Sequence, residues 1–312
     1  MFRSSALGTS SALSACALLL GSCGGGGSAS TSMSTLNLGL TDAPVSGVTK
    51  VWIQFTGVEV KPAGGNPIDF TFSPEKAFDL LTLQGGTTAT FLNGTTVPAG
   101  QYEWVRLMVD TKPGASYVMD STGQHDLTIP SGAETGLKLI QGFTMPVGGV
   151  ANFTVDFVVS KSLLAPQGLS PDYLLKPVLR LVDNTQVGTI SGTFQATTLS
   201  NPLNTHCGTR PPVIYVYTGA GVTPDVIYNS PDTTDPASAA QPLTTATAAL
   251  NSMNDYAYSV AFLPSGNYAV AFTCDPDDPA VDESALTPVA IHFAVFSQTV
   301  AVTANMTTTV NF

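Results

Sequence analysis

The densest group of acidic side chains lies near the C-terminus, where it could bind a metal ion. It comprises Asp275, Asp277, Asp278, Asp282 and Glu283. Ca²⁺ takes about six to eight oxygen ligands, and carboxylates on one loop can supply several of them. The spacing is not that of an EF-hand, because prolines interrupt the run and no central glycine is present. We expect a solvated acidic loop, with a structural calcium site as the alternative, to which Asp225 or Asp255 could contribute.

The histidines do not form a catalytic pattern. His125, His206 and His292 are scattered, and only His125 has a carboxylate beside it, that of Asp126. The chain has no Gly-x-Ser-x-Gly turn, no His-Glu-x-x-His pair and no glycine-rich phosphate loop leading into a helix. The sequence therefore predicts no catalytic residue and no cofactor.

Asp42 is a second candidate for binding a ligand. It lies in the stretch Thr41-Asp42-Ala43-Pro44, which ends a predicted strand. Its carboxylate could bind a cation or another ligand at the edge of a sheet. The favoured interpretation is an Asx-type turn, in which Asp42 accepts backbone N–H bonds and Pro44 stops the strand.

Four aromatic residues could form a platform for stacking against a carbohydrate. They are Trp52, Trp104, Tyr215 and Tyr217. Aromatic side chains in strands more often pack in the core or against cross-strand neighbours, so packing is the favoured interpretation.

Short strands must position all of these groups, because the pattern is that of an all-β protein. Apolar and polar residues alternate in residues 36–40, and Val51, Ile53 and Phe55 share one face of the run 48–60. Glycine- and proline-rich turns separate the strands, and only residues 160–165 predict a helical turn. Further strands are predicted at residues 77–83, 101–110, 137–144, 151–159 and 173–182.

A second series of strands follows a break at residues 183–186. Its members are predicted at residues 187–193, 213–218, 256–262, 268–273, 289–296 and 307–312. The stretch 229–249 is rich in Pro, Thr, Asp and Ala and is predicted to be a long surface loop. The two series predict two β-sandwich domains in tandem, at residues 34–186 and 187–312.

Both predicted domains contain the pattern apolar-Pro-small-Gly-x-Tyr before a strand, at residues 97–102 and 263–268. Proline fixes φ for a turn, glycine takes a positive φ and tyrosine begins the strand. The pattern is common in transthyretin-like and related immunoglobulin-like sandwiches. It indicates a fold, not a site.

The composition supports this architecture and excludes one class of partner. Of 312 residues, 43% are hydrophobic and 11% are charged, a balance that argues against disorder. The net charge is −11, so the chain would repel phosphate backbones, and nucleic-acid binding is not expected. No apolar segment after Cys23 reaches the ~18 residues that a transmembrane helix needs.

The N-terminus has the architecture of a secretory signal peptide, with Arg3 ahead of an apolar run that ends at Leu20. The stretch Leu20-Gly21-Ser22-Cys23 resembles the lipobox of bacterial lipoproteins. The resemblance implies that residues 1–22 are removed and that Cys23 becomes an N-terminus acylated with palmitate or a similar fatty acid.

The segment after the cut is a Gly/Ser tether, residues 23–33, flexible enough to lift a domain off a membrane surface. Gly24 directly follows the acylated cysteine. A glycine at this position resembles the sequences of lipoproteins that are sent to the bacterial outer membrane. Cys207 and Cys274 form an even pair in an exported protein, and we predict a disulfide bond between them. Because His206 adjoins Cys207, a two-cysteine metal site is the alternative.

Residues 34–186 resemble a bacterial and archaeal lipoprotein module described as domain of unknown function 4382. The segments that carry the resemblance are residues 38–44, 51–55, 58–60, 78–81, 98–102, 105–107 and 174–177. Residues 187–312 resemble transthyretin-like and carboxypeptidase-regulatory-like β-sandwiches. Neither resemblance implies a catalytic residue.

Together these patterns predict a lipoprotein of the cell envelope, periplasmic or surface-exposed, that acts as a non-catalytic binding, scaffolding or adhesion module. The expected partners are the membrane, through the lipid, and an envelope protein or glycan that the sequence does not specify. The alternative is a periplasmic hydrolase, metal-dependent or glycan-active, that uses the acidic loop at residues 275–283.

Overall fold

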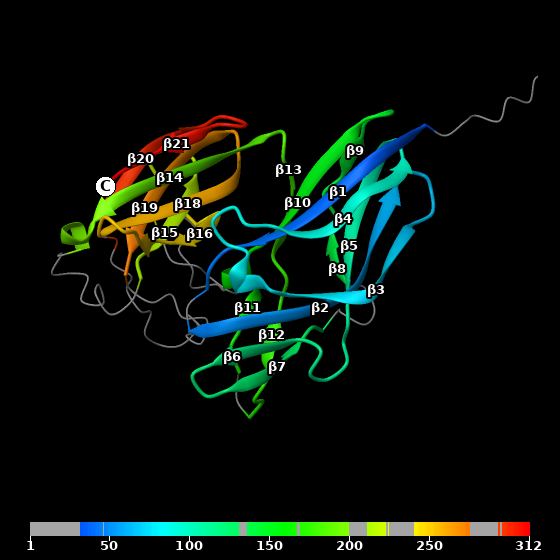
Figure 1. Cartoon of the computed structure of the whole chain (residues 1–312), viewed down its shortest axis with the longest axis horizontal. Coiled ribbons are helices and arrows are strands. Elements are labelled where there is room, and N and C mark those ends of the chain that lie inside the picture. The colour runs from blue at the N-terminus through cyan, green and yellow to red at the C-terminus, as the bar shows by residue number, and fades with distance from the viewer. Residues whose placement is uncertain are drawn as a thin grey trace, which may run out of the picture. The chain divides into compact units, whose positions relative to one another are not determined.

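The all-β architecture predicted from the sequence is confirmed (Figure 1). The computed structural model describes residues 32–45, 47–130, 136–166, 169–199, 211–222, 224, 240–274, 293 and 295–312. Over these residues the strands form four sheets, two drawn from residues 33–183 and two from residues 187–309. The short helical elements are η1 (Leu80–Thr82), α1 (Val159–Ser162) and η2 (Ala196–Leu199).

Two facing sheets build the first sandwich. The smaller has the order β13-β10-β1-β4, with β1 and β10 parallel. Its strands are β1 (Met33–Asp42), β4 (Ala89–Pro98), β10 (Val150–Phe157) and β13 (Leu179–Asp183). The larger has the order β11-β12-β7-β6-β2-β5-β8, with β3 paired to β2 and β9 paired to β5. Its strands are β2 (Val48–Pro62), β3 (Ile68–Asp79), β5 (Gly100–Val109), β6 (Tyr117–Asp120), β7 (Gln124–Thr128), β8 (Leu137–Leu139), β9 (Phe143–Met145), β11 (Leu163–Leu164) and β12 (Tyr173–Leu175).

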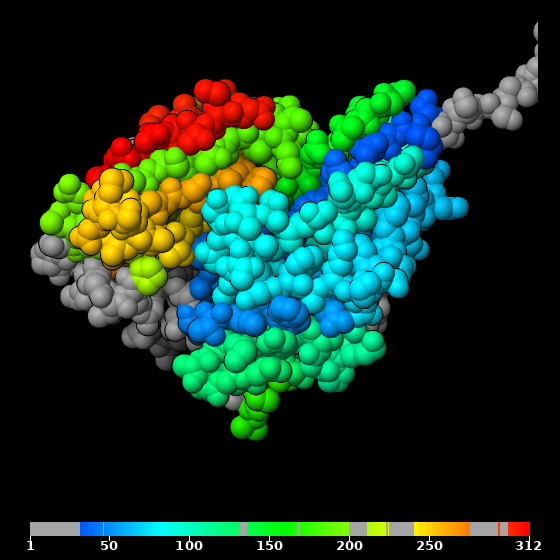
Figure 2. Space-filling model, viewed as in Figure 1, coloured from blue at the N-terminus to red at the C-terminus, as the bar shows by residue number. Residues whose placement is uncertain are grey.

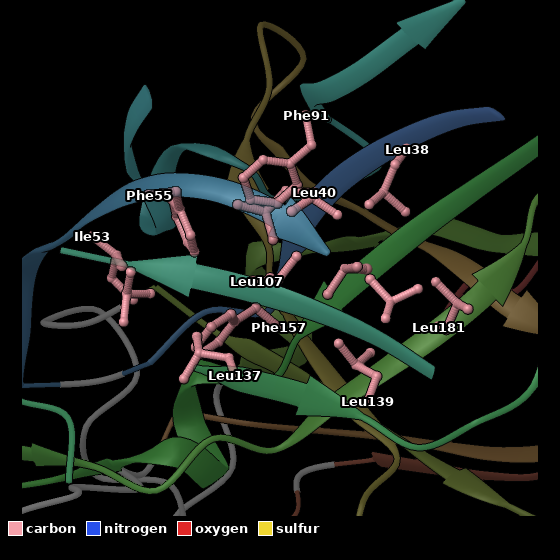
Figure 3. Close-up of a cluster of buried hydrophobic side chains, with 14 of the residues drawn as sticks. Leu38, Leu40, Ile53, Phe55, Phe91, Leu107, Leu137, Leu139, Phe157 and Leu181 are labelled. Atoms are coloured by element: carbon pink, nitrogen blue, oxygen red, sulfur yellow. The ribbon is translucent and has the colours of Figure 1, made fainter. Parts of the chain in front are cut away.

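The predicted alternation fills the core between these sheets. Leu38 and Leu40 of β1 are buried together with Ile53 and Phe55 of β2 in one cluster (Figure 3). Phe55 meets Phe91 of β4 edge to face, with 4.9 Å between ring centroids. Successive side chains of a strand point to opposite faces, so every second residue of β1 and β2 reaches this core.

A bulge changes the alternation within β2. The register shifts between Phe55 and Gly57, so that Val58 and Val60 are buried after the shift. A Cβ atom on Gly57 would lie 2.5 Å from the Met108 side chain and 2.6 Å from a backbone oxygen of the neighbouring strand β3. The close approach of β3 and β5 therefore requires glycine at this position.

The second sandwich contains two four-stranded sheets, with the orders β17-β18-β14-β21 and β16-β15-β19-β20. Its strands are β14 (Val187–Gln195), β15 (Val213–Thr218), β16 (Thr244–Thr247), β17 (Ala249–Leu250), β18 (Asp255–Pro264), β19 (Gly266–Thr273), β20 (Val295–Val302) and β21 (Thr307–Thr309). Phe194 of β14 stacks on Phe272 of β19 with centroids 4.5 Å apart, and this pair lies in the second core.

Several predicted elements need correction. Residues 244–249 were placed in a surface loop, but residues 244–247 form β16 and Ala249 begins β17. Ala246 is buried against the second core because β16 pairs with β15. The strand expected at residues 77–83 ends at Asp79, whose carboxylate caps η1 by accepting the N–H of Leu81. The strand expected at residues 173–182 is two strands, because Pro177 lacks the N–H that a ladder needs. The strand expected at residues 137–144 is also two, β8 and β9.

The repeated Pro-small-Gly-x-Tyr pattern marks two equivalent corners. In each, the turn carries the chain from one sheet of a sandwich to the other, from β4 to β5 and from β18 to β19. The Tyr102 hydroxyl donates to the Pro98 carbonyl at 2.8 Å, and the Tyr268 hydroxyl donates to the Pro264 carbonyl at 2.6 Å. Gly100 has a φ of 135°, as predicted for its turn, whereas the φ of the equivalent Gly266 is not in the left-handed region, so the prediction is wrong there. Among the described residues, no helix is long and apolar enough to span a bilayer.

Candidate ligand-binding site

A pocket of about 280 Å³ lies at the end of β5, beside the hairpin of β6 and β7. This volume is at the lower limit for small-molecule sites, which start at about 300 Å³. Carboxylates, hydroxyls, one amine and apolar side chains line the pocket. The lining residues are Asp110, Thr111, Lys112, Pro113, Gly114, Ser116, Asp126, Leu127, Thr128, Ile129 and Asp172.

One wall of the pocket is an ordered ion pair. The buried Asp110 carboxylate accepts the backbone N–H of Lys112 at 3.0 Å and its Nζ at 2.9 Å. Hydrogen bonds from Lys112 hold the pKa of Asp110 below its ordinary value, because they stabilise the ionised form. The Lys112 side chain is 77% exposed, so its ammonium group is open to solvent at the rim.

A contact between two distant segments fixes another part of the pocket lining. Asp126 and Asp172 line the pocket, and their chain neighbours His125 and Pro171 meet directly. His125 Nδ1 lies 2.9 Å from the Pro171 carbonyl oxygen, and β7 pairs in parallel with β12 just beyond. His125 therefore acts as a positioning residue, because it joins the two segments that bring carboxylates into the pocket.

A polar network on the other side of β7 holds His125 in place. His125 Nε2 lies 3.2 Å from Asp120 Oδ1, and the Tyr173 hydroxyl donates to Asp120 Oδ2 at 2.9 Å. Thr122 donates to Asp120 through its hydroxyl and its backbone N–H, both at 2.7 Å. Burial raises the pKa of Asp120, but the bonds from Thr122 and Tyr173 and the nearby His125 together lower it well below its ordinary value.

This network does not have the geometry of a hydrolytic triad. In a triad, one ring nitrogen faces the carboxylate and the other faces the nucleophile. Here the Thr122 hydroxyl, 2.7 Å away, and Asp120 share the Nε2 side of His125, while Nδ1 faces a carbonyl oxygen. The sequence paired His125 with Asp126, whereas the structure pairs it with Asp120. The turn Asp120-Ser121-Thr122-Gly123 was the signal that could have located this partner, since aspartate favours such turns.

The four candidate aromatic residues all have packing partners. Tyr215 and Tyr217 are 1% and 0% exposed, which confirms the packing interpretation. Trp52 is half-buried and stacks on Tyr117 with centroids 6.0 Å apart. Trp104 is also half-buried, and two cations cover its ring. They are Arg106, 4.8 Å from the centroid, and Lys138, 4.4 Å from it.

Asp42 is buried at the end of β1, and its two oxygens differ. Oδ1 accepts the N–H of Val159 at 3.1 Å, at the start of α1. The predicted acceptor role is confirmed, but this partner shows that Asp42 joins distant segments and does not only shape a local turn. Oδ2 is buried with no hydrogen-bond partner. Burial raises the pKa of Asp42 well above its ordinary value, and repulsion from Asp156 and Asp79 adds to this, although backbone hydrogen bonds oppose the rise.

The other candidate sites lie outside the described residues. These are Cys23, His206, Cys207, Asp225, the acidic run from Asp275 to Glu283, and His292. In the part of the chain that the structure describes, no three His, Cys, Asp or Glu side chains gather closely enough to hold a metal ion. Cys274 is described and is 2% exposed in the second core. The Cys207–Cys274 disulfide remains a prediction, and the calcium site remains the alternative to a solvated acidic loop.

The sheets and their two cores define a β-sandwich protein without a recognisable catalytic centre among the described residues. Residues 33–177 match the family described as "Domain of unknown function (DUF4382)". The resemblance to this family that was read from the sequence is confirmed over these residues.

Comparison with other proteins adds little beyond this family. No curated protein matches the chain. Among solved structures it is similar to the Bacillus anthracis TIE protein, at 8% identity and a TM-score of 0.20, covering 90% of this chain and 34% of that one. A leucine-rich repeat protein from Bacteroides thetaiotaomicron has 12% identity and a TM-score of 0.23, covering 90% and 26%. The minor pilin of Streptococcus agalactiae has 10% identity and a TM-score of 0.19, covering 89% and 94%. The chain thus spans only 34% and 26% of the first two proteins, and such TM-scores carry no argument about function.

Proposed function

We propose that this protein is an acylated lipoprotein of the bacterial cell envelope that binds a ligand and catalyses no reaction. One observation carries the proposal. The N-terminal segment begins with a positive charge, continues as an apolar run and ends in residues 20–23, where a cysteine directly follows small residues. Gly24 after that cysteine favours the outer membrane as the destination.

The pocket at the end of β5 is the place where we expect the ligand to bind. Charge-assisted hydrogen bonds from hydroxyl groups to carboxylates are among the stronger polar contacts. Asp126 and Asp172 could each accept such bonds, and Lys112 could donate. This chemistry suits a hydroxyl-rich ligand, and an envelope glycan is the class that we propose.

Metabolic labelling tests the anchor. Cells that express the full chain are grown with radiolabelled palmitate, and the mature N-terminus is identified by mass spectrometry. We expect label on the wild type, a mature chain that begins at Cys23, and no label on Cys23→Ser. Cys16→Ser is the matched control and should keep the label, because residue 16 lies in the removed leader. An unlabelled wild-type chain would refute the anchor.

Binding to an array of bacterial glycans tests the pocket. We expect the double variant Asp126→Asn and Asp172→Asn to lose at least tenfold in affinity for any glycan that the wild type binds. Asp255→Asn is the control, since Asp255 is half-buried in β18 of the second sandwich. Equal binding by all three proteins would contradict the assignment to the pocket. Cleavage of a bound glycan would contradict the non-catalytic role.

A further inference from the structure

The chain enters the first sandwich at an end that we call the entry tip. The tip consists of the start of β1, the turn at residues 98–100 between β4 and β5, and the turn at residues 146–149 between β9 and β10. Backbone hydrogen bonds join the three: the N–H of Ala99 donates to Ser32 at 2.7 Å, and the N–H of Gly148 donates to Met33 at 2.9 Å. Figure 1 shows β1 beginning beside the end of β9 and the start of β10.

The entry tip exposes apolar side chains. Met33 is 44% exposed, Val147 76% and Val150 58%. Thr35 of β1 is the register partner of Val150, so the valine lies beside the first residues of the described chain. Figure 2 shows the start of β1 and the β9–β10 region on one end of the surface. Exposed apolar groups that gather at one place commonly mark a contact surface.

The entry tip is also free of charge, although the protein is strongly acidic. Residues 32–41, 86–102 and 139–155 contain no Asp, Glu, Lys or Arg, while the chain carries a net charge of −11. Along β5, the first charged residue after the tip is Glu103, which lies 3.8 Å from Lys61 of β2. An acidic protein is repelled by an anionic membrane surface, and its uncharged end is the one that can approach closely.

The acylation site lies within short reach of this tip. Nine residues lie between Cys23 and Met33, and the ten residue-to-residue steps of a fully extended chain span at most about 35 Å. We propose that the entry tip rests on the lipid bilayer, with Met33, Val147 and Val150 in contact with the boundary between headgroups and acyl chains. The proposal depends on the proposed acylation of Cys23, which keeps the tip near the membrane. Lipid and tip would then attach the protein at two points.

Quenching of an introduced tryptophan tests the contact. The full acylated chain is reconstituted into phosphatidylcholine vesicles with brominated acyl chains, and the fluorescence of wild-type Trp52 and Trp104 is subtracted. We expect the added fluorescence of Val147→Trp to be quenched at least twofold more than that of Met253→Trp. Met253 is an ideal control because it is also 76% exposed and lies in the turn between β17 and β18, strands that do not pair with the tip.

Val150→Trp serves as a second probe in case Val147→Trp folds poorly. Equal quenching of the tip probes and Met253→Trp would overturn the proposal. Mass spectrometry of the N-terminus in the same sample shows whether Cys23 is acylated. This measurement distinguishes the absence of a tip contact from the absence of the lipid anchor. Acylation without selective quenching refutes the tip contact alone. If the chain is not acylated, the same comparison is made after adding vesicles to the protein in solution, and selective quenching then supports the tip while refuting the anchor.

Discussion

Replacing Arg180 by methionine should show how much an unpaired buried charge lowers the free energy of unfolding of the first sandwich. Arg180 of β13 is the register partner of Asp156 of β10, and its Nε donates to Asp156 Oδ2 at 2.6 Å. The Asp156 side chain is 4% exposed, so its carboxylate is largely shielded from water in the folded chain. Removing one partner of a buried ion pair costs about 3–5 kcal/mol, because the remaining charge stays desolvated. We expect the free energy of unfolding to fall by that amount.

Urea denaturation of wild-type and variant chains, followed by tryptophan fluorescence, measures this loss. Adding Asp156→Leu to the variant should recover most of the loss, because an apolar pair needs no compensating charge. Lys61→Met is the control, since a more exposed pair with Glu103 contributes at most about 1 kcal/mol.

The pKa of Lys161 gives an independent measure of the loss of the Arg180 charge. Burial lowers the pKa of Lys161 to about 8, and the positive charge of Arg180 lowers it further in the same direction. Loss of Arg180 should therefore raise this pKa, which an NMR titration of the Lys161 side chain can follow. A stability loss under about 1 kcal/mol, with no change at Lys161, would refute the reasoning.

Three further predictions concern pH, calcium and the cysteines. The pKa of Asp120 is lowered in the folded chain, so its contribution to stability is present above the ordinary carboxylate range and is lost as the pH falls through the folded value. Thermal unfolding of Asp120→Asn should thus show lower stability at pH 7 and a weaker dependence on acidification; a slope equal to that of the wild type would contradict this. Added Ca²⁺ should leave the melting temperature of the wild type unchanged, because we expect the acidic run to be a solvated loop; a rise that Asp277→Asn and Asp278→Asn abolish would contradict this and support the calcium site. Non-reducing peptide mapping should join Cys207 to Cys274, a loop whose closure contributes about 4 kcal/mol, whereas free thiols would exclude the bond.

The sequence predicted which side chains share a face far better than which strands are neighbours. A period of two residues is a local property, so the buried faces of β1 and β2 could be read directly from Leu38, Leu40, Ile53 and Phe55. The parallel pairing of β1 with β10 joins residues more than a hundred positions apart. No local pattern specifies such a partner, because it is set by how both sheets bury their faces together.

The candidate site was hidden for the same reason. Its pocket needs the end of β5, the strand β7 and the segment before β12, three pieces that only the tertiary fold assembles. The sequence singled out His125 but could not supply Asp120 or Tyr173 as its partners, since Tyr173 comes from a strand about fifty residues later. Strands β6 and β7 themselves were missed, because they are short and partly exposed and so lack a clear alternation.

The distribution of charge along the strands of the first sandwich connects the pocket to the entry tip. Turns tolerate charged residues readily, so packing does not explain why the turns at 98–100 and 146–149 have none. The opposite end of the same strands is rich in charge: β5 begins at Gly100 in the tip and runs toward Asp110 in the pocket. Ten residues of strand span about 30 Å. If the uncharged end meets the bilayer, the fold holds the charged pocket about 30 Å away from it, facing the space where a soluble or cell-wall ligand is found.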